Sequence, residues 1–326
     1  MTGSWVLGVD SGGSGLRIGL AGAAGTGRAG TLSSGEPVRT GSDGIDAGHL
    51  LEQLVPMARE LLAAAGGGPV AAVAIGAAGM ATLGDRLRAE LPGALAASLG
   101  VRRLALATDA VTAYAGALGQ RPGAVVAAGT GMVALGTDLT GWRRADGWGH
   151  LLGDCGGGAW IGRAGLEAAL RAHDGRSGGS AALLRAAEAA FGPAGGLPGA
   201  VYPRTDRPAV LASFAPEVAR CAAAGDGLAA AVLALAARHI AEAAEAVCPP
   251  GGGLDIALTG GLFKMGAPLL APLEEELSAR LPGARTVPAA GDPLAGSLLL
   301  AGALATGSLR LPLHPTLLHV PAERGR

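Results

Sequence analysis

The sequence is poor in aromatic residues and contains almost no lysine. Phe, Tyr and Trp make up only 3% of the 326 residues, and Lys264 is the single lysine. Hydrophobic residues still reach 49%, so the core must be built mainly from Ala, Leu and Val. The formal net charge of -1 offers no basic surface to nucleic acid or to an anionic membrane. We therefore expect a soluble, folded protein with neither of these partners.

Cysteine is also scarce. Cys155, Cys221 and Cys248 are widely spaced and form no CxxC pair, which excludes a disulfide framework or a zinc site. The first apolar run has no basic segment before it and is interrupted by Asp10, so no signal peptide is predicted. The Ala-rich stretch from Leu228 to Ala246 carries four charged or titratable side chains and is not expected to cross a membrane. These features predict a cytoplasmic protein.

Several motifs of nucleotide and ester chemistry are missing. There is no GxxxxGK[ST] sequence, which excludes a P-loop, and no GxGxxG between a strand and a helix, which argues against a dinucleotide site. The GxSxG arrangement of many hydrolases is absent as well. The chemistry must therefore come from other residues.

Glycine is abundant instead, with 58 residues, and many of them end apolar runs. Trp5 to Leu20 predicts two strands joined by a tight turn at Ser11 to Gly15. The same order of strand, glycine turn and strand recurs at Ala124 to Thr137, around Gly129 to Gly131. This repeat predicts a boundary near residue 120, with domains at 1–119 and 120–326.

Strands and helices alternate along the chain, which predicts an α/β fold with a cleft between two similar halves. We expect further strands at Val70–Gly79, Arg103–Thr108, Trp142–Trp148, Leu254–Leu258 and Arg285–Val287. We expect helices at Ala47–Ala65 (capped by Asp46), Asp85–Leu99 (broken at Pro92), Ala110–Gly119, Arg163–Ala172, Leu228–Val247 and Leu294–Gly307. Ser33–Asp46 and Pro193–Pro208 are expected to be loops, and the Pro-rich tail from Leu309 is expected to be poorly ordered.

Glycine turns after strands can bind phosphate through backbone N–H groups, and ligands of α/β sheets lie beyond the carboxyl ends of strands. Three such turns, at Ser11–Gly15, Gly129–Gly131 and Gly260–Gly261, could converge on one nucleotide. Asp10 stands at the end of the first strand, where a carboxylate could hold Mg²⁺. The pattern favours a nucleoside triphosphate with Mg²⁺, although the first turn alone is equally consistent with an ordinary hairpin.

Asp109 follows a buried strand directly. A carboxylate there could accept the proton of a substrate hydroxyl that attacks a γ-phosphate. It could equally cap the helix that begins at Ala110, and one residue can do both.

Gly147 to Gly162 is the most unusual stretch. Asp154 lies there among glycine and apolar residues, where it could bind sugar hydroxyls or an ammonium group, or hold a turn. Trp148 and His150 could line a sugar pocket or pack at the core or its rim. Cys155 is expected to be a small buried residue and not a nucleophile.

Together these segments resemble the sugar kinase, Hsp70 and actin superfamily, and within it the group of N-acetylglucosamine kinases and BadF/BadG/BcrA/BcrD activating subunits. The similar segments are GVDSGGSGLRIGL, TDA at Thr108–Ala110, AAGTGMVALG, LTGGLF at Leu258–Phe263 and DPLAGSLLLA. GWGHLLGDCGGGAWIG is similar to the sugar-site stretch of the N-acetylglucosamine kinase branch. The resemblance runs from Gly8 to Ala301 and implies two ribonuclease-H-like domains of actin/hexokinase type, with a last helix that could pack back on the first domain.

The resemblance implies roles for individual residues. Asp10 would lie near Mg²⁺, and Asp109 would be the general base. The residues implied for ATP are Ser11, Gly12, Gly13, Ser14, Arg17, Gly129, Thr130, Gly131, Gly260, Gly261 and Lys264. Those implied for the sugar are Trp148, Gly149, Asp154, Thr130 and Gly79.

Two departures fall on the sugar side. The glutamate and serine of the related sequences are replaced by Cys155 and Gly157, and the loop of a sugar-binding asparagine reads Pro37-Val38-Arg39. The pattern also resembles actinobacterial glucosamine kinases. We therefore predict an ATP- and Mg²⁺-dependent kinase that phosphorylates the 6-hydroxyl of an amino sugar, glucosamine first; a homodimer is possible. N-acetylglucosamine kinase is the alternative. A non-catalytic ATP-binding activator or sugar-sensing regulator is the second alternative, and the cysteines of an iron–sulfur activator are missing.

Overall fold

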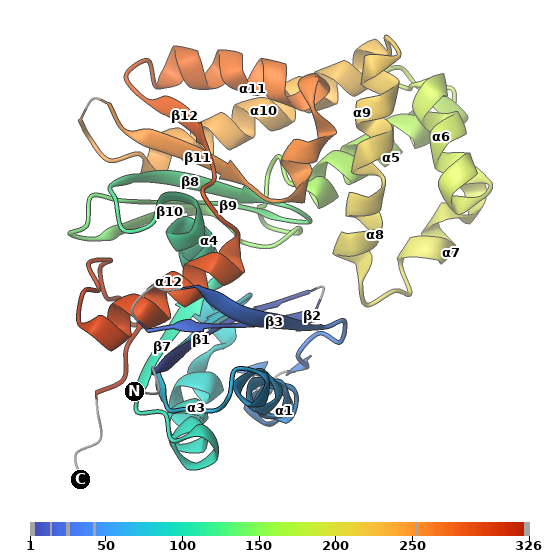
Figure 1. The fold of residues 1–326 in the computed structure, drawn as a ribbon. Coiled ribbons are helices and arrows are strands. Elements are labelled where there is room, and N and C mark those ends of the chain that lie inside the picture. Colours follow the sequence, from blue (N-terminus) through green and yellow to red (C-terminus); the bar gives the residue numbers. More distant parts are fainter. Residues whose placement is uncertain (1–3, 14, 24–26, 42–43, 252, 323–326) are drawn as a thin grey trace. The chain divides into compact units, whose positions relative to one another are not determined.

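The computed structural model describes residues 4–13, 15–23, 27–41, 44–251 and 253–322 (Figure 1). The chain forms two compact units. The first contains Met1–Pro122, Thr137–Trp142 and Pro288–Arg326, and the second contains Gly123–Gly136 and Arg143–Val287. Each unit combines one main sheet with helices, which confirms the predicted α/β class.

The first unit is built on a sheet with the strand order β13-β7-β6-β1-β2-β3. Its strands are β1 (Trp5–Gly12), β2 (Gly15–Gly22), β3 (Arg28–Ser34), β6 (Val70–Ala77), β7 (Arg103–Thr108) and β13 (Leu318–His319). β1 pairs antiparallel with β2 and parallel with β6, and β6 pairs parallel with β7. The predicted opening hairpin is therefore correct. β3 was not predicted, because its sequence has no apolar run and all of its residues are exposed or half-buried.

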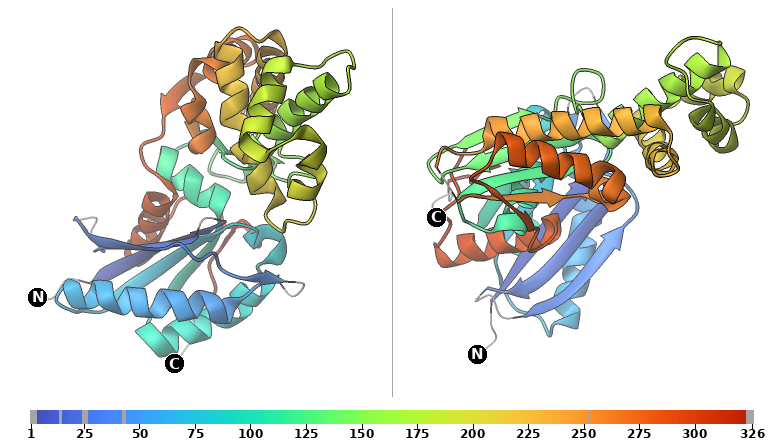
Figure 2. Two further views of the ribbon diagram at one scale, coloured as in Figure 1. Left: turned by 90° about the vertical axis from the view of Figure 1, so that its right-hand side faces the viewer. Right: turned by 90° about the horizontal axis from the view of Figure 1, so that it is seen from above.

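Helices cover both faces of this sheet (Figures 1 and 2). α1 (Ala47–Ala64) and α3 (Asp85–Leu99) lie on one face, and α4 (Asp109–Leu118) and α12 (Pro293–Thr306) lie on the other. Short elements near the turns are β4 (Thr40–Gly41), β5 (Gly44–Ile45) and α2 (Met80–Leu83). Asp46 caps α1 as predicted, since its carboxylate accepts the N–H of His49 at 3.1 Å.

α12 packs unusually closely on this unit because glycine stands at the contacts. A Cβ added at Gly8 of β1 would lie 2.7 Å from the backbone nitrogen of Leu298. A Cβ at Gly296 would lie 1.9 Å from the backbone oxygen of Thr112 in α4. The Ser297 hydroxyl, fully buried, donates to the carbonyl oxygen of Val9 at 2.8 Å. The C-terminal helix is thus an integral layer of the first unit.

Two predictions for this unit are wrong. α3 continues through Pro92, because Leu87, Leu91 and Leu95 are fully buried along one face and hold the helix despite the missing N–H. Residues 309–322 of the tail are also ordered. Leu318 is buried in β13, which pairs antiparallel with β7, and the Trp142 indole donates to the carbonyl oxygen of Pro312 at 2.7 Å. Pairing with an edge strand therefore outweighs the proline content of this segment.

The second unit has the strand order β10-β9-β8-β11-β12. Its strands are β8 (Gly123–Ala128), β9 (Met132–Thr137), β10 (Trp142–Asp146), β11 (Asp255–Thr259) and β12 (Arg285–Pro288). β8, β9 and β10 lie side by side, and β11 joins beside β8. In the first unit, β1, β2 and β3 lie side by side in the same way, and β6 joins beside β1. β11 is parallel to β8. The sequence repeat thus corresponds to two sheets of the same topology.

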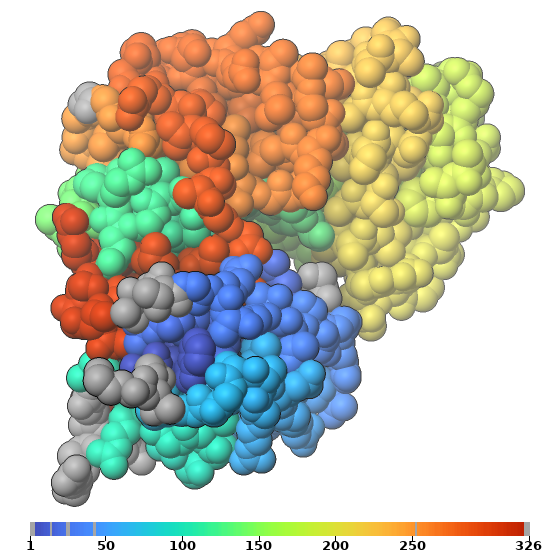
Figure 3. All heavy atoms as spheres, in the orientation of Figure 1, coloured from blue at the N-terminus to red at the C-terminus, as the bar shows by residue number. Residues whose placement is uncertain are grey.

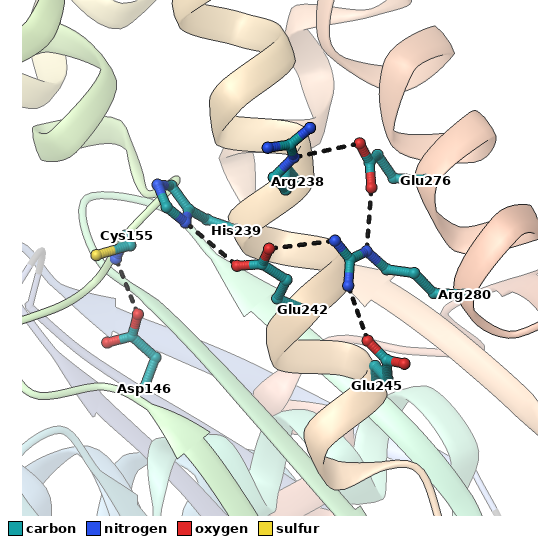
Figure 4. A network of polar contacts seen from close by, with 8 residues as sticks. All are labelled: Asp146, Cys155, Arg238, His239, Glu242, Glu245, Glu276 and Arg280. Carbon is teal, nitrogen blue, oxygen red and sulfur yellow. Dashed lines mark hydrogen bonds and ion pairs between the residues drawn. The ribbon is translucent and has the colours of Figure 1, made fainter.

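Four helices form most of the core of this unit: α5 (Gly158–His173), α9 (Ala215–Ala223), α10 (Gly227–Val247) and α11 (Ala267–Arg280). α10 and α11 are joined by Arg280, which pairs with Glu242, Glu245 and Glu276 at 2.9–3.1 Å (Figure 4). By length and composition alone α10 could span a membrane. Its residues Leu233, Ile240 and Ala244 are fully buried in the core instead.

The remaining helices of this unit are α6 (Ala181–Phe191), α7 (Leu197–Val201) and α8 (Arg207–Ser213), which form a projecting part (Figures 2 and 3). The prediction of a loop at 193–208 is therefore wrong. Pro198 and Pro208 occupy the first turns of α7 and α8. A backbone N–H in a first turn has no acceptor within the helix, so the missing N–H of proline costs nothing there, and its fixed φ fits the helix. α5 also begins earlier than predicted, at Gly158 instead of Arg163.

Candidate active site

In the first unit, parallel strands bring the predicted catalytic and metal residues to one edge of the sheet. Asp10 lies near the end of β1, Gly79 follows β6, and Asp109 follows β7 directly. Because β1, β6 and β7 are parallel, their carboxyl ends meet at the same edge. This is the edge at which α/β sheets bind ligands.

Asp109 is the first residue of α4, but it is not the cap. Thr108 has the extended backbone of an N-cap, and its hydroxyl accepts the N–H of Val111 at 3.3 Å. The Asp109 carboxylate accepts the neighbouring N–H of Ala110 at 2.9 Å. The capping interpretation of Asp109 is therefore wrong, because Thr108 has that role. The first turn of a helix also favours an anionic side chain.

Arg17 links two carboxylates of the first unit. Its guanidinium binds Asp10 Oδ2 at 2.6 and 3.1 Å, and it binds Asp292 Oδ2 at 2.7 Å. Burial lowers the pKa of Arg17, but the hydrogen bonds and charges of both carboxylates outweigh this and leave the pKa raised. Asp292 is also the N-cap of α12, accepting the N–H of Ala295 at 2.9 Å. No local pattern indicates this role of Asp292, because Asp292 meets Arg17 across 275 positions of the chain.

A single carboxylate such as Asp10 matches the small number of protein ligands that Mg²⁺ usually has in a nucleotide site. Mg²⁺ is usually held there by one or two carboxylates together with waters and phosphate oxygens. Among the described residues, no group of three or more His, Cys, Asp or Glu side chains could hold a metal ion. Asp10 stays a candidate for a metal contact, with its Oδ2 bound by Arg17.

The β1–β2 turn leaves space for a ligand. A Cβ added at Gly12 or Gly13 would meet no atom within 4 Å, while Ser11 is buried and its carbonyl accepts the N–H of Ala78 at 2.9 Å. Gly15 has φ +125°, and a Cβ there would lie 2.1 Å from the oxygen of Ser34. Ser14 lies outside the described residues. The turn is thus open at Gly12 and Gly13 and anchored on both sides.

In the second unit, the Gly129–Gly131 turn rests on the start of α5. The N–H groups of Gly158 and Ala159 donate to the carbonyl oxygens of Gly129 and Thr130 at 2.9 and 2.8 Å. A Cβ at Gly157 would lie 2.8 Å from the carbonyl carbon of Gly131, so a side chain there would displace the turn. The glycine at 157 therefore allows this close packing.

Asp154 contacts the same turn. A Cβ at Gly131 would lie 2.3 Å from Asp154 Oδ2, and Asp154 Oδ1 accepts the N–H of Gly149 at 2.9 Å. Burial raises the pKa of Asp154, and the charge of Asp146 adds to the rise against the lowering effect of the Gly149 N–H. Asp154 thus joins the glycine turn to Gly149, two segments that sequence reasoning assigned to different ligands.

The loop before Asp154 exposes apolar side chains. Leu151 and Leu152 are exposed, as is Trp148, whose ring is stacked by the Arg144 guanidinium at 5.2 Å from its centroid. Trp148 is therefore a surface residue and not part of a core.

The third glycine turn and the single lysine also lie in this unit. Gly260 has φ +108° and approaches β8 so closely that a Cβ would lie 2.1 Å from the oxygen of Ala128. Gly261 begins a 3-10 turn, Gly261–Met265, in which Lys264 is exposed. Gly260, Gly261 and Lys264 remain candidates for nucleotide contact.

Cys155 is half-buried, and its pKa is raised first by burial and then by the charges of Asp146 and Asp154. A raised pKa lowers the fraction of thiolate, which is the reactive form.

We expect iodoacetamide to modify Cys155 more slowly at pH 7.5 than a free cysteine, with the rate still rising at pH values where the free thiol has levelled off. Peptide mapping by mass spectrometry, with Cys155→Ser as the blank, measures this rate. Modification faster than that of free cysteine would contradict the inert role.

Two sheets of the same topology, each with a glycine turn between its first two strands, define an α/β fold of actin/hexokinase type. The chain belongs to the BadF/BadG/BcrA/BcrD ATPase family, whose model matches residues 7–301. This confirms the family resemblance. As a member of an ATPase family, the chain uses ATP, with Mg²⁺ as the usual partner ion.

Several of the proteins similar to this chain are named as sugar kinases. A stretch of 107 residues is 36% identical to the N-acetylmuramic acid/N-acetylglucosamine kinase of Clostridium acetobutylicum, covering 32% of this chain and 34% of that relative. The match thus spans about a third of the relative's length. A candidate N-acetylglucosamine kinase from Chromobacterium violaceum is 29% identical, with a TM-score of 0.70 over 91% of this chain and 98% of its own. A ROK family glucokinase from Streptomyces griseus, in complex with glucose and AMPPNP, shares the fold at 20% identity, with a TM-score of 0.53 over 91% and 98% of the two chains.

Proposed function

We propose that this protein is a kinase that transfers the γ-phosphoryl group of ATP to the 6-hydroxyl of an amino sugar, with glucosamine as the first candidate. The observation that carries the proposal is the position of Asp109 at the carboxyl edge of the first sheet, one residue after β7 and inside the first turn of α4. A carboxylate at this edge can take the proton of a hydroxyl that attacks phosphorus.

In the proposed reaction the sugar oxygen forms a bond to the γ-phosphorus while the bond to the ADP oxygen breaks. Asp109 takes the proton released from the hydroxyl. The backbone N–H groups of the open Gly12–Gly13 turn would donate to phosphate oxygens. The Gly129–Gly131 turn is the second candidate, with its Gly129 N–H already donating to the carbonyl oxygen of Gly131 at 2.9 Å. Bound Mg²⁺ neutralises phosphate charge, and Asp10 is the residue that would hold it.

Glucosamine is favoured over its N-acetyl derivative by the carboxylate of Asp154, which could bind an ammonium group. The N-acetylglucosamine alternative is supported by the names of the relatives. A sugar-sensing regulator without turnover is the candidate of a different class. Solubility and a cytoplasmic location belong to the proposal, as they do for sugar kinases in general.

The proposal is tested by measuring ADP release with glucosamine, N-acetylglucosamine, glucose, mannose and no sugar. We expect kcat/KM for glucosamine to exceed that for each other sugar by about tenfold or more. A sugar whose amino group is missing or acetylated cannot pair with the carboxylate, and an unpaired polar group in a site lowers kcat/KM by about tenfold or more. A preference for N-acetylglucosamine would replace the substrate but keep the reaction. No sugar-dependent ADP release from any hexose would overturn the kinase proposal and favour the regulator.

A further inference from the structure

Two aspartates of the second unit have a backbone conformation that is costly for any residue with a side chain. Among the described residues, the non-glycine residues with positive φ are Leu139, Asp146 and Asp154. Asp146 has φ 60° and Asp154 has φ 54°. Such strained positions are destabilising and concentrate at functional sites. Here the two strained aspartates are bonded to each other.

Asp146 uses both carboxylate oxygens on consecutive backbone groups. Oδ1 accepts the N–H of Asp154 at 2.5 Å. Oδ2 accepts the N–H of Cys155 at 2.9 Å, the contact that Figure 4 shows. The intervening loop leaves no space around this contact, since a Cβ at Gly153 would lie 2.4 Å from Asp146 Oδ1. Hydrogen bonds to an ionised carboxylate are stronger than neutral ones, so the pair fixes the backbone at 154–155.

The fixed backbone aims the Asp154 side chain. With its left-handed φ, Asp154 places Oδ1 on the N–H of Gly149 and Oδ2 against Gly131. Its carbonyl oxygen accepts the N–H of Gly157 at 2.9 Å, one residue before the helix start that supports the Gly129–Gly131 turn. A continuous set of contacts therefore runs from Asp146 through Asp154 to the turn.

We propose that Asp146 is a positioning residue, which holds Asp154 in its left-handed conformation and so fixes the place of the carboxylate that would contact the sugar. The inference rests on the proposed function in taking Asp154 as the sugar-side carboxylate. In the part of the chain that the structure describes, the Asp146 carboxylate accepts the backbone N–H groups of Asp154 and Cys155, and we give it no contact with a reacting atom.

Two substitutions separate the backbone conformation of residue 146 from its hydrogen bonds. Asp146→Asn tolerates the left-handed conformation but turns an N–H₂ group toward one backbone N–H, and Asp146→Gly keeps the conformation and removes both acceptors. We expect kcat/KM for the sugar to fall about 10- to 100-fold in both, as for other residues that orient a site side chain. The KM for ATP should stay within about twofold, because the Gly129–Gly131 turn keeps its hydrogen bonds from the N–H groups of Gly158 and Ala159.

Asp138→Asn is the matched control. Asp138 also accepts backbone N–H groups of its own turn, those of Thr140 and Gly141, but it lies on an exposed turn of the first unit. Its kinetics should equal those of the parent protein. Equal losses for ATP and sugar in the Asp146 variants would indicate a merely structural role and overturn the proposal.

A double-mutant cycle tests whether Asp146 acts through Asp154. In an Asp154→Asn background, Asp146→Gly should cost less than about threefold in kcat/KM for the sugar, because coupled residues are not additive. A full 10- to 100-fold loss in that background would contradict the mechanism.

Amide hydrogen exchange provides a readout that does not depend on turnover. Asp146→Gly should speed exchange of the Asp154 and Cys155 amides about tenfold or more, since both lose their acceptor. If the parent protein phosphorylates no sugar, the proposed function fails, and this exchange experiment alone decides the positioning role. Unchanged exchange at both amides would overturn it.

Discussion

Asp109→Asn is expected to lower kcat for sugar phosphorylation by about 10²- to 10⁴-fold, the usual contribution of a general base. The amide cannot take the proton of the attacking hydroxyl. It can still accept the N–H of Ala110, because Asn keeps the oxygen that makes this 2.9 Å bond. ATP binding, measured by calorimetry, should therefore stay within about twofold of the parent value, since only an interaction made in the transition state is removed.

Asp85→Asn is the matched control for this experiment. Asp85 is the first residue of α3 as Asp109 is of α4, but its side chain is 95% exposed and pairs with Arg88 at 2.7 Å. Its kinetics and thermal stability should match those of the parent. Retained turnover in Asp109→Asn would remove Asp109 from the role of base. Equal loss of ATP binding and turnover would assign it to binding instead.

Gly296→Ala is expected to destabilise the protein by about 3 kcal/mol or more, the upper range for overpacking a core. The new Cβ would lie 1.9 Å from the backbone oxygen of Thr112 and 2.6 Å from the backbone nitrogen of Gly116. Neither backbone atom can move without shifting α4, so α12 must move away from its place in the first unit. Urea unfolding, read as the change in free energy of unfolding, measures this cost.

The same helix supplies the control. Gly302 lies two turns further along α12, and a Cβ there would meet no atom within 4 Å. Gly302→Ala should be neutral or stabilising by up to about 1 kcal/mol, because alanine is the better helix former. If Gly296→Ala and Gly302→Ala behaved alike, the close contact of α12 with α4 would not exist in solution.

The parts of the fold that were predicted correctly are those with a strong local pattern. Apolar runs that end in glycine identify β1, β2, β6, β8 and β9, and Asp109 follows from the sharp junction of β7 and α4. Elements that are stabilised by residues far away in the sequence cannot be predicted from such local patterns. β3 has a polar sequence and forms because β2 offers it an edge, and α7 and α8 begin at prolines that, read locally, indicate a loop.

The candidate site shows the same division. The glycine turns and Asp154 stand out in the sequence, because glycine clusters and an acid among apolar residues are unusual. Asp146 and Asp292 do not stand out. Asp146 acts on the backbone eight and nine residues later, and Asp292 meets Arg17 across 275 positions of the chain. Contacts of this kind depend on the loop path and on the return of the C-terminal helix, which no local pattern encodes.

The return of the chain at Pro288 also determines the order in which the protein can assemble during synthesis. The first unit has its earliest strands at Trp5–Gly12, yet its sheet ends with Leu318–His319 and its helical layer needs Pro293–Thr306. On the ribosome, the second unit has all of its strands by Pro288, while the unit that emerged first still lacks a layer of its core. Until α12 is synthesised, the first unit therefore stays incomplete, and the β1 surface around Gly8 is not covered by this helix. A chain that stops before α12 would leave the N-terminal unit, and not the C-terminal one, exposed to chaperones and proteases.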